Sequence, residues 1–135
     1  MSNPYRLLVT GARGPLSEDQ MSLVVRKLTI MTGPYIAMGR PVFLIEGECP
    51  LGGVDIVARD WAKDQEGIIL EPHPPNLADG VAGLMARNTE MAESHPDYWV
   101  AFPNSKSKGT WDCLRKASNA GVPGRIYPLG NAAEQ

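Results

Sequence analysis

Three times along this sequence, a short apolar run ends in a loop of glycine or small polar residues, and a helical pattern follows. The loops are residues 10–14 (TGARG), 47–55 (GECPLGGVD) and 104–110 (NSKSKGT). Apolar runs that alternate with helices in this way predict a parallel sheet covered on both faces. The carboxyl ends of parallel strands meet at one edge of the sheet, which is where ligands bind in such folds. We therefore expect the three loops to converge there.

The full pattern predicts an α/β fold, a Rossmann-like three-layer sandwich with a mostly parallel sheet of about five strands. We expect Gly33 and Pro34 to stop the first helix, residues 72–80 to form a stiff proline-rich loop, and residues 131–135 to fray. The length fits a single domain over residues 1–135, with its core at residues 5–129. The expected strands are residues 5–10, 41–46, 67–71, 97–102 and 125–129, and the expected helices are residues 17–31, 53–62, 81–94 and 111–120.

The composition argues against several classes of protein. A net charge of −2 gives no electrostatic support for general nucleic-acid binding. No apolar run approaches the roughly 20 residues of a membrane helix, and no secretory signal precedes the first strand. Cys49 and Cys113 do not form a disulfide scaffold or a zinc site, and His73 and His95 have no second ligand at metal spacing. We expect a cytoplasmic protein without a metal or a cofactor.

The loop at residues 104–110 has the composition of a phosphate site. Ser107, Gly109 and Thr110 fall at or near the start of a helix, where backbone N–H groups lack partners and the helix dipole favours an anion. Arg13, after a tight turn at another strand end, is a second candidate phosphate ligand. Helix capping by Ser107 and Thr110, and a solvated Arg13, are the structural alternatives. Three such loops together point to a nucleotide-sized ligand.

Other candidate residues have an equally ordinary structural alternative. Asp55 holds ribose hydroxyls or caps its helix. Asp79 contacts a base from the proline-rich loop or belongs to an Asp-Gly turn. Arg87 and Asn88 reach into the site or lie on a solvated helix face. Trp111 stacks on a base, makes a subunit contact, or is buried.

Taken in order, these motifs resemble the SLOG superfamily of Rossmann-like nucleotide-binding domains, and within it the YspA-related branch of bacteria and phages. The sequence is more distantly similar to cytokinin phosphoribohydrolases and lysine-decarboxylase-like proteins. It runs from Leu7 to Tyr127. The motifs are TGAR at 10–13, GVD at 53–55 after Gly47, ADG at 78–80, RNTEM at 87–91, AF at 101–102 after Asp97, and SKGT at 107–110.

The resemblance implies that the ligand is a nucleotide or a nucleotide-derived molecule of the ADP-ribose or AMP type. It would bind at the carboxyl ends of the strands, with phosphate on the loops, ribose near Asp55 and the base under the loop at residues 72–80. Small α/β domains of this kind often pair through helices, so we expect a homodimer or higher oligomer. The implied ligand-binding residues are Gly11, Arg13, Gly47, Gly53, Asp55, Arg87, Asn88, Ser107, Gly109 and Thr110.

One departure from the related phosphoribohydrolases bears on catalysis. Those enzymes carry the motif PGGxGTxxE, whose Glu is catalytic, whereas residues 103–110 here are PNSKSKGT and Cys113 stands at the position of the Glu. The candidate carboxylates for N-glycosidic hydrolysis are therefore Asp112, Asp55 and Asp79. Three functions remain open: a nucleotide sensor or sequestering domain, a nucleotide N-glycosidic hydrolase, and a phage or bacterial interaction protein. A phage-encoded protein would lie in the host cytoplasm.

Overall fold

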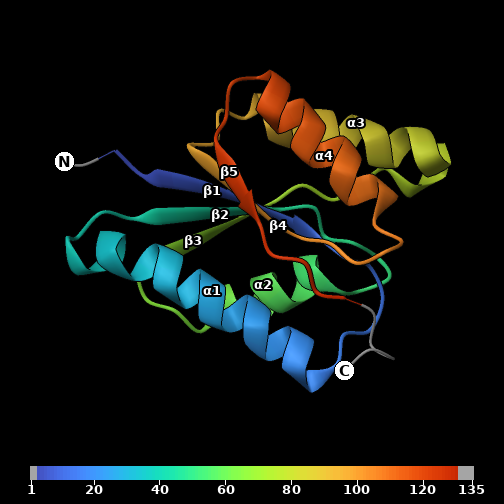
Figure 1. The fold of residues 1–135 in the computed structure, drawn as a ribbon. Helices are drawn as coiled ribbons and strands as arrows, with labels where there is room; N and C mark the ends of the chain where they lie inside the picture. Colours follow the sequence, from blue (N-terminus) through green and yellow to red (C-terminus); the bar gives the residue numbers. More distant parts are fainter. Residues whose placement is uncertain (1–2, 131–135) are drawn as a thin grey trace.

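A computed structural model describes residues 3–130. Its five strands form one sheet in the order β3-β2-β1-β4-β5, and every pair of neighbours is parallel. Helices α1 and α2 cover one face, and α3 and α4 cover the other (Figure 1). The predicted α/β sandwich with a parallel sheet is confirmed. The elements are β1 Tyr5–Gly11, α1 Glu18–Ala37, β2 Val42–Glu46, α2 Val54–Lys63, β3 Ile68–Pro72, the 3-10 turn η1 Leu77–Asp79, α3 Gly80–Glu93, β4 Tyr98–Phe102, α4 Lys108–Asn119 and β5 Gly124–Ile126.

The central strand β1 is buried on both faces, as its apolar run predicts. Leu7 and Val9 pack into the larger apolar cluster on the α1 and α2 side, and Leu8 packs into the smaller cluster on the α3 and α4 side. Successive side chains of a strand point to opposite faces, so a near-continuous apolar run supplies both clusters. This central position places the end of β1 between the neighbouring loops at the carboxyl edge of the sheet.

The prediction that Gly33 and Pro34 end the first helix is wrong. Helix α1 continues to Ala37, with Pro34 inside its last turn. The proline removes one backbone donor, but the turn after it is held by packing. The Tyr35 ring stacks on Tyr5, with centroids 4.0 Å apart, and the Arg40 guanidinium lies over both rings. Tertiary contacts of the last turn outweigh the local stop signal.

Helix α4 begins at Lys108, three residues before the predicted start at Trp111, and its N-cap is Ser107. The earlier start places Gly109 and Thr110 in the first turn. Strand β5 is shorter than predicted and ends at Ile126, although the backbone N–H of Leu129 still donates to Pro103 O at 2.8 Å. The predicted frayed tail, residues 131–135, lies outside the described residues.

Candidate functional site

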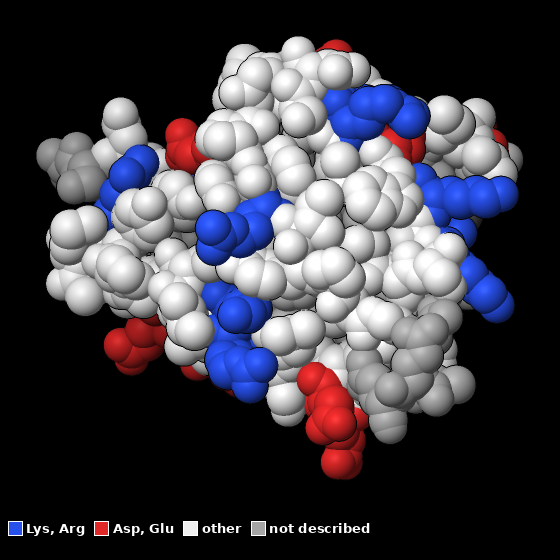
Figure 2. Space-filling view, in the orientation of Figure 1, with Lys and Arg blue, Asp and Glu red and all other residues white. Residues whose placement is uncertain are grey.

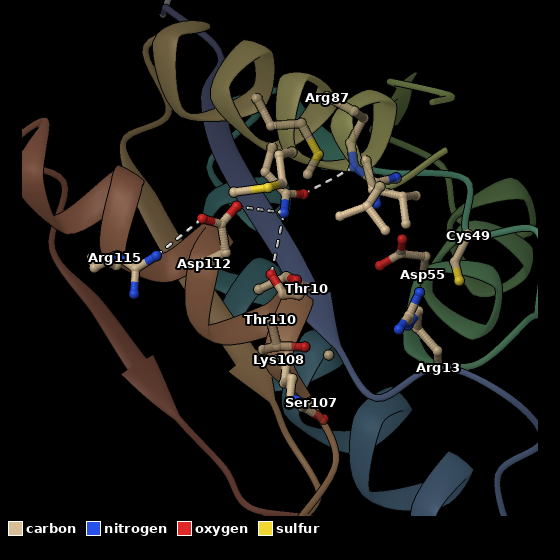
Figure 3. Close-up of a pocket in the computed structure, with 17 residues that line it drawn as sticks. Thr10, Arg13, Cys49, Asp55, Arg87, Ser107, Lys108, Thr110, Asp112 and Arg115 are labelled. Atoms are coloured by element: carbon tan, nitrogen blue, oxygen red, sulfur yellow. Dashed lines mark hydrogen bonds and ion pairs between the residues drawn. The ribbon is translucent and has the colours of Figure 1, made fainter. Parts of the chain in front are cut away.

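The three loops converge on one cavity of about 380 Å³ at the carboxyl edge of the sheet. Figure 3 shows Arg13, Cys49 and Asp55 on one side of it, Ser107, Lys108 and Thr110 on the other, and Arg87 across from the start of α4. This volume lies in the range of small-molecule sites. The cavity is lined by Thr10, Gly11, Arg13, Cys49, Asp55, Val81, Leu84, Met85, Arg87, Asn88, Met91, Ser107, Lys108, Gly109, Thr110, Asp112 and Arg115.

The start of α4 supplies backbone donors to the cavity. Ser107 does not cap the helix with its side chain. Its hydroxyl instead accepts from the Asn104 N–H and donates to Asn104 Oδ1, both at 2.9 Å, which fixes the preceding loop. The first N–H groups of a helix have no intrahelical partner. The N–H groups of Lys108, Gly109 and Thr110 therefore remain available to an anion.

Thr110 is the polar side chain that points most directly to a ligand. The residue is 4% exposed and lines the cavity. Its hydroxyl makes no hydrogen bond with any described residue and is not sealed from solvent, so a ligand in the cavity can reach it. Across the cavity, the exposed Arg13 side chain also makes no hydrogen bond or ion pair within residues 3–130. The sequence prediction that Arg13 and Thr110 lie at one site is consistent with this arrangement.

The cationic side chains of the cavity strengthen its attraction for anions. Arg13, Lys108 and Arg115 all line it. Figure 2 shows Lys and Arg side chains at the right-hand edge of the molecule, where α4 begins in Figure 1, and also over its left half. The lining itself holds the cations Arg13, Arg87, Lys108 and Arg115 against the carboxyl groups of Asp55 and Asp112, so the cavity is locally basic.

Asp55, in the first turn of α2, is a buried carboxylate on the cavity wall. Burial raises its pKa to about 6, against the opposing effects of the Arg87 charge and of hydrogen bonds from the backbone N–H groups of Cys49 and Gly47. At neutral pH the group is mostly ionised and can accept hydrogen bonds from hydroxyls. A small drop in pH lets it carry a proton.

Arg87 and Asn88 hold the site together. Arg87 Nη1 donates to the Gly47 carbonyl, and Arg87 Nε donates to Asn88 Oδ1 at 2.9 Å. Asn88 Nδ2 in turn donates to the Gly109 carbonyl at 3.2 Å and to Asp112 Oδ2 at 3.1 Å. Together they connect α3 to the β2 loop and to α4 (Figure 3). Both Asn88 donors are used within the protein, whereas Arg87 uses two of its five N–H donors in these hydrogen bonds.

Asp112 lines the cavity as a firmly paired carboxylate. It accepts from Asn88, and its oxygens pair with Arg115 at 3.1 Å and Lys116 at 3.0 Å. Burial alone would raise its pKa, but the Asn88 hydrogen bond and the charges of Lys116 and Arg115 outweigh burial and lower it. A carboxylate that stays ionised and paired is poorly suited to act as a general acid.

Three of the candidate residues lie outside the cavity lining. Asp79 is exposed, at the end of η1, and accepts from Asn76 Nδ2 at 3.1 Å. A Cβ at Gly47 would collide with the Arg87 guanidinium, and a Cβ at Gly53, where φ is 96°, would collide with the Ala12 carbonyl oxygen. Both glycines therefore make room for other parts of the protein and not for a ligand in the cavity. The loop at residues 72–80 also supplies no lining residue up to Gly80, so the structure places the apolar wall on α3 instead.

Sequence reasoning missed Glu46, the last residue of β2. Its side chain is fully buried, Oε1 accepts from the Glu48 N–H at 2.8 Å, and Oε2 has no partner among the described residues. Burial raises its pKa to about 8, the Glu48 N–H opposes the rise, and the charge of Asp55 adds to it. The signal in the sequence was the strand register, because Val42, Leu44 and Glu46 alternate onto one buried face.

No metal or membrane element is evident in the described part of the chain. Within residues 3–130, no group of three or more His, Cys, Asp or Glu side chains is placed to hold a metal ion. The helices found there are all too short or too polar to cross a bilayer.

Comparison with known proteins assigns neither a family nor a function to this chain. No family model matches the chain. The Gene 61 protein of Mycobacterium phage D29 is 38% identical over 77 residues, which cover 53% of this chain and 61% of that protein. The C-terminal domain of a Pyrococcus furiosus hydrogenase is 19% identical with a TM-score of 0.44, covering 90% of this chain and 89% of that one. An isochorismatase family protein is 14% identical with a TM-score of 0.46, covering 90% and 76%. With scores this low, the fold assignment depends on the strand order itself.

Proposed function

We propose that this chain binds a nucleotide or a nucleotide-derived ligand of the AMP or ADP-ribose type, as a sensor or sequestering domain. The observation that carries the proposal is the Thr110 hydroxyl in the first turn of α4, which has no partner among the described residues although the residue is only 4% exposed. It lies across a cavity of about 380 Å³ from Arg13, whose side chain has no partner among those residues either. The ordered motifs from residue 10 to residue 110 support membership of the SLOG superfamily, in its YspA-related branch.

The cavity has a separate chemistry for each part of such a ligand. The first turn of α4, Thr110 and Arg13 would hold a phosphate, because backbone N–H groups, a hydroxyl and a guanidinium all donate to its oxygens. Asp55 would accept from ribose hydroxyls. The side chains of Val81, Leu84, Met85 and Met91 on α3 would contact the base.

Titration calorimetry with AMP, ADP-ribose and cyclic ADP-ribose isomers tests the proposal. We expect at least one to bind the wild-type protein, and Arg13→Ala to weaken that binding by about 1.5–3 kcal/mol through loss of a charge-assisted bond. Arg26→Ala is the matched control, since Arg26 is an exposed arginine of α1 outside the cavity lining. Absence of both heat and thermal shift across the panel, or unchanged affinity in Arg13→Ala, would contradict the proposal.

A second candidate function is N-glycosidic hydrolysis, and one observation favours it. Among the carboxylates that the sequence indicates, Asp55 lies in the cavity with its pKa raised to about 6, whereas Asp112 is paired and Asp79 lies outside. An oxocarbenium-like transition state needs a nearby anion or acid. Chromatography after incubation with nucleoside monophosphates checks this, and hydrolysis predicts free base that Asp55→Asn abolishes and Asp79→Asn does not.

A further inference from the structure

The cavity wall formed by α3 is mainly apolar. Its apolar members are Val81, Leu84, Met85 and Met91, and they share the helix with Arg87, which lies opposite Ser107 and Lys108 in Figure 3. A ligand whose phosphate lies on the first turn of α4 would therefore extend its other end toward thioethers and methyl groups. Such groups supply contact area without hydrogen bonds.

The two polar residues that α3 adds to the lining are held in place by hydrogen bonds within the protein. An asparagine amide can pair with an adenine edge, since it offers a donor and an acceptor side by side. Here both Asn88 donors are used, by the Gly109 carbonyl and by Asp112, and its oxygen accepts from Arg87. Arg87 is held by that oxygen and by the Gly47 carbonyl.

The other polar lining residues divide in the same way. The Thr10 hydroxyl is hydrogen-bonded to Cys113, Ser107 is tied to Asn104, and Arg115 is paired with Asp112. What remains for a ligand is Arg13, Lys108 and Thr110, the lone pairs of Asp55 that the Cys49 and Gly47 N–H groups leave open, and the further N–H groups of Arg87, together with the backbone of the first turn of α4. These are groups for a phosphate and a pentose.

The base end of the cavity is also open to water. Val81 is 71% exposed and Met85 is 46% exposed, although both line the cavity. A polar base edge at this mouth would keep hydrogen bonds to solvent, so different bases would lose similar hydration on binding. Flexible methionine side chains adapt to ligands of different shape, which further reduces discrimination.

We infer that this cavity selects the phosphate and the pentose of its ligand and does not discriminate between bases, so that its ligand class is the nucleoside 5′-monophosphates as a group. The inference rests on the proposed nucleotide function and adds to it a statement of specificity. Recognition is concentrated at Thr110, Arg13 and Asp55, and α3 supplies an apolar contact of low selectivity.

A panel of AMP, GMP, CMP and UMP, with adenosine and ADP-ribose, tests the inference by titration calorimetry on the full chain. We expect the four monophosphates to bind within about fivefold of each other, because purine and pyrimidine rings differ modestly in the apolar area they bury. Adenosine should bind about 10- to 100-fold more weakly than AMP, since it lacks the charge-assisted bonds to phosphate.

The outcomes separate the inference from the function it builds on. A preference of about 20-fold or more for one monophosphate, or binding of ADP-ribose without any monophosphate, would overturn the inference and leave nucleotide binding standing. Absence of binding by every phosphorylated member would overturn the proposed function, and the inference with it. Binding of all four monophosphates at similar affinity supports both.

A variant of the apolar wall gives a second measurement. Met85→Ala should weaken the binding of all four monophosphates by the same factor of about two to five, because the substitution removes apolar contact area and no base-specific bond. Met38→Ala is the matched control, as Met38 is also an exposed methionine, 69% exposed at the end of α1 and outside the cavity lining. A loss confined to one base in Met85→Ala would contradict the inference.

Discussion

The two sides of the cavity hold buried carboxyl groups in opposite states. On the β2 side, burial raises the pKa of Glu46 to about 8 and that of Asp55 to about 6. On the α4 side, the hydrogen bond from Asn88 and the charges of Lys116 and Arg115 lower the pKa of Asp112 despite its burial. One side of the site therefore holds or readily takes a proton near neutral pH, whereas the other stays ionised.

The difference follows from the kind of partner that each element can supply. Asp112 lies on a helix, where Arg115 and Lys116 at i+3 and i+4 reach back to its carboxylate. Glu46 ends a strand, and its Oε1 accepts from the N–H of Glu48 two residues on, which leaves Oε2 without a partner among the described residues. Neutral backbone donors offset burial less than cations do.

Disrupting the backbone of the β2 side should have the largest effect. Gly53→Ala places a Cβ against the Ala12 carbonyl oxygen at a residue with φ 96°, a conformation that L side chains rarely adopt. We expect a loss of about 3–5 kcal/mol in the free energy of unfolding, measured by urea denaturation. Gly33→Ala is the control, since a Cβ there meets nothing within 4 Å. Equal stability of the two variants would show that the loop at Gly53 rearranges freely.

Removing the unpartnered acid should stabilise the protein at high pH. The folded-state pKa of Glu46, about 8, lies above its ordinary value of 4.5, so the folded chain binds the proton more tightly. Its effect on stability is therefore absent below pH 4.5, grows more unfavourable from pH 4.5 to about 8, and levels off above that. Glu46→Gln should be more stable than wild type by about 2–4 kcal/mol at pH 9 and nearly equal at pH 5.

Urea denaturation at pH 5, 7 and 9 measures the difference between Glu46→Gln and wild type. Asp55 and Glu46 interact, so the change between pH 7 and pH 9, where Asp55 is mostly ionised in both proteins, is the part of the difference that reports the Glu46 proton. A difference that stays constant with pH would contradict a proton on Glu46.

On the α4 side we expect the carboxyl group to stabilise the protein as the pH rises, which is the opposite of the effect of Glu46. The pKa of Asp112 is lowered below its ordinary value of 3.8, so its contribution is present above that value and is lost as the pH falls through the folded-state pKa. Asp112→Asn should cost about 1–2 kcal/mol at pH 7 and progressively less toward pH 3. The side chain is 11% exposed, so the pairs are only partly screened. Parallel pH curves for the variant and wild type in urea would contradict this assignment.

The sequence predicts the fold and the position of the site for the same reason. The apolar runs and the loops that follow them predict a parallel sheet. In such a sheet the loops that carry Arg13, Asp55 and Thr110 lie at one edge, irrespective of the contacts that the side chains make. Local signals are enough for this, because each depends on neighbours in the chain.

What the sequence could not supply depends on partners far along the chain. Gly47 makes room for Arg87, and Gly53 makes room for the Ala12 carbonyl. Glycine is needed at both positions because of these packing contacts, which no local motif reveals. Asn88 has the composition of a ligand-binding residue, but Gly109 and Asp112 occupy its donors. The last turn of α1 continues past Pro34 because Tyr35 finds Tyr5. Each correction comes from a tertiary contact that outweighs a local rule.

The smallest expected effect is on ligand affinity, and it tests whether Arg13 and Thr110, on opposite sides of the cavity, contact the same ligand. Thr110→Ala removes a neutral donor and should weaken binding of the phosphorylated ligand by about 0.5–1.5 kcal/mol, less than Arg13→Ala. If both residues contact one phosphate, the double variant should lose a different amount from the sum of the single losses, because the residues share a partner. Thr29→Val, on the exposed face of α1, is the control for replacing a threonine. Calorimetry on the four proteins measures the coupling, and strict additivity, or unfolding of either single variant, would contradict a shared phosphate at the open end of the cavity.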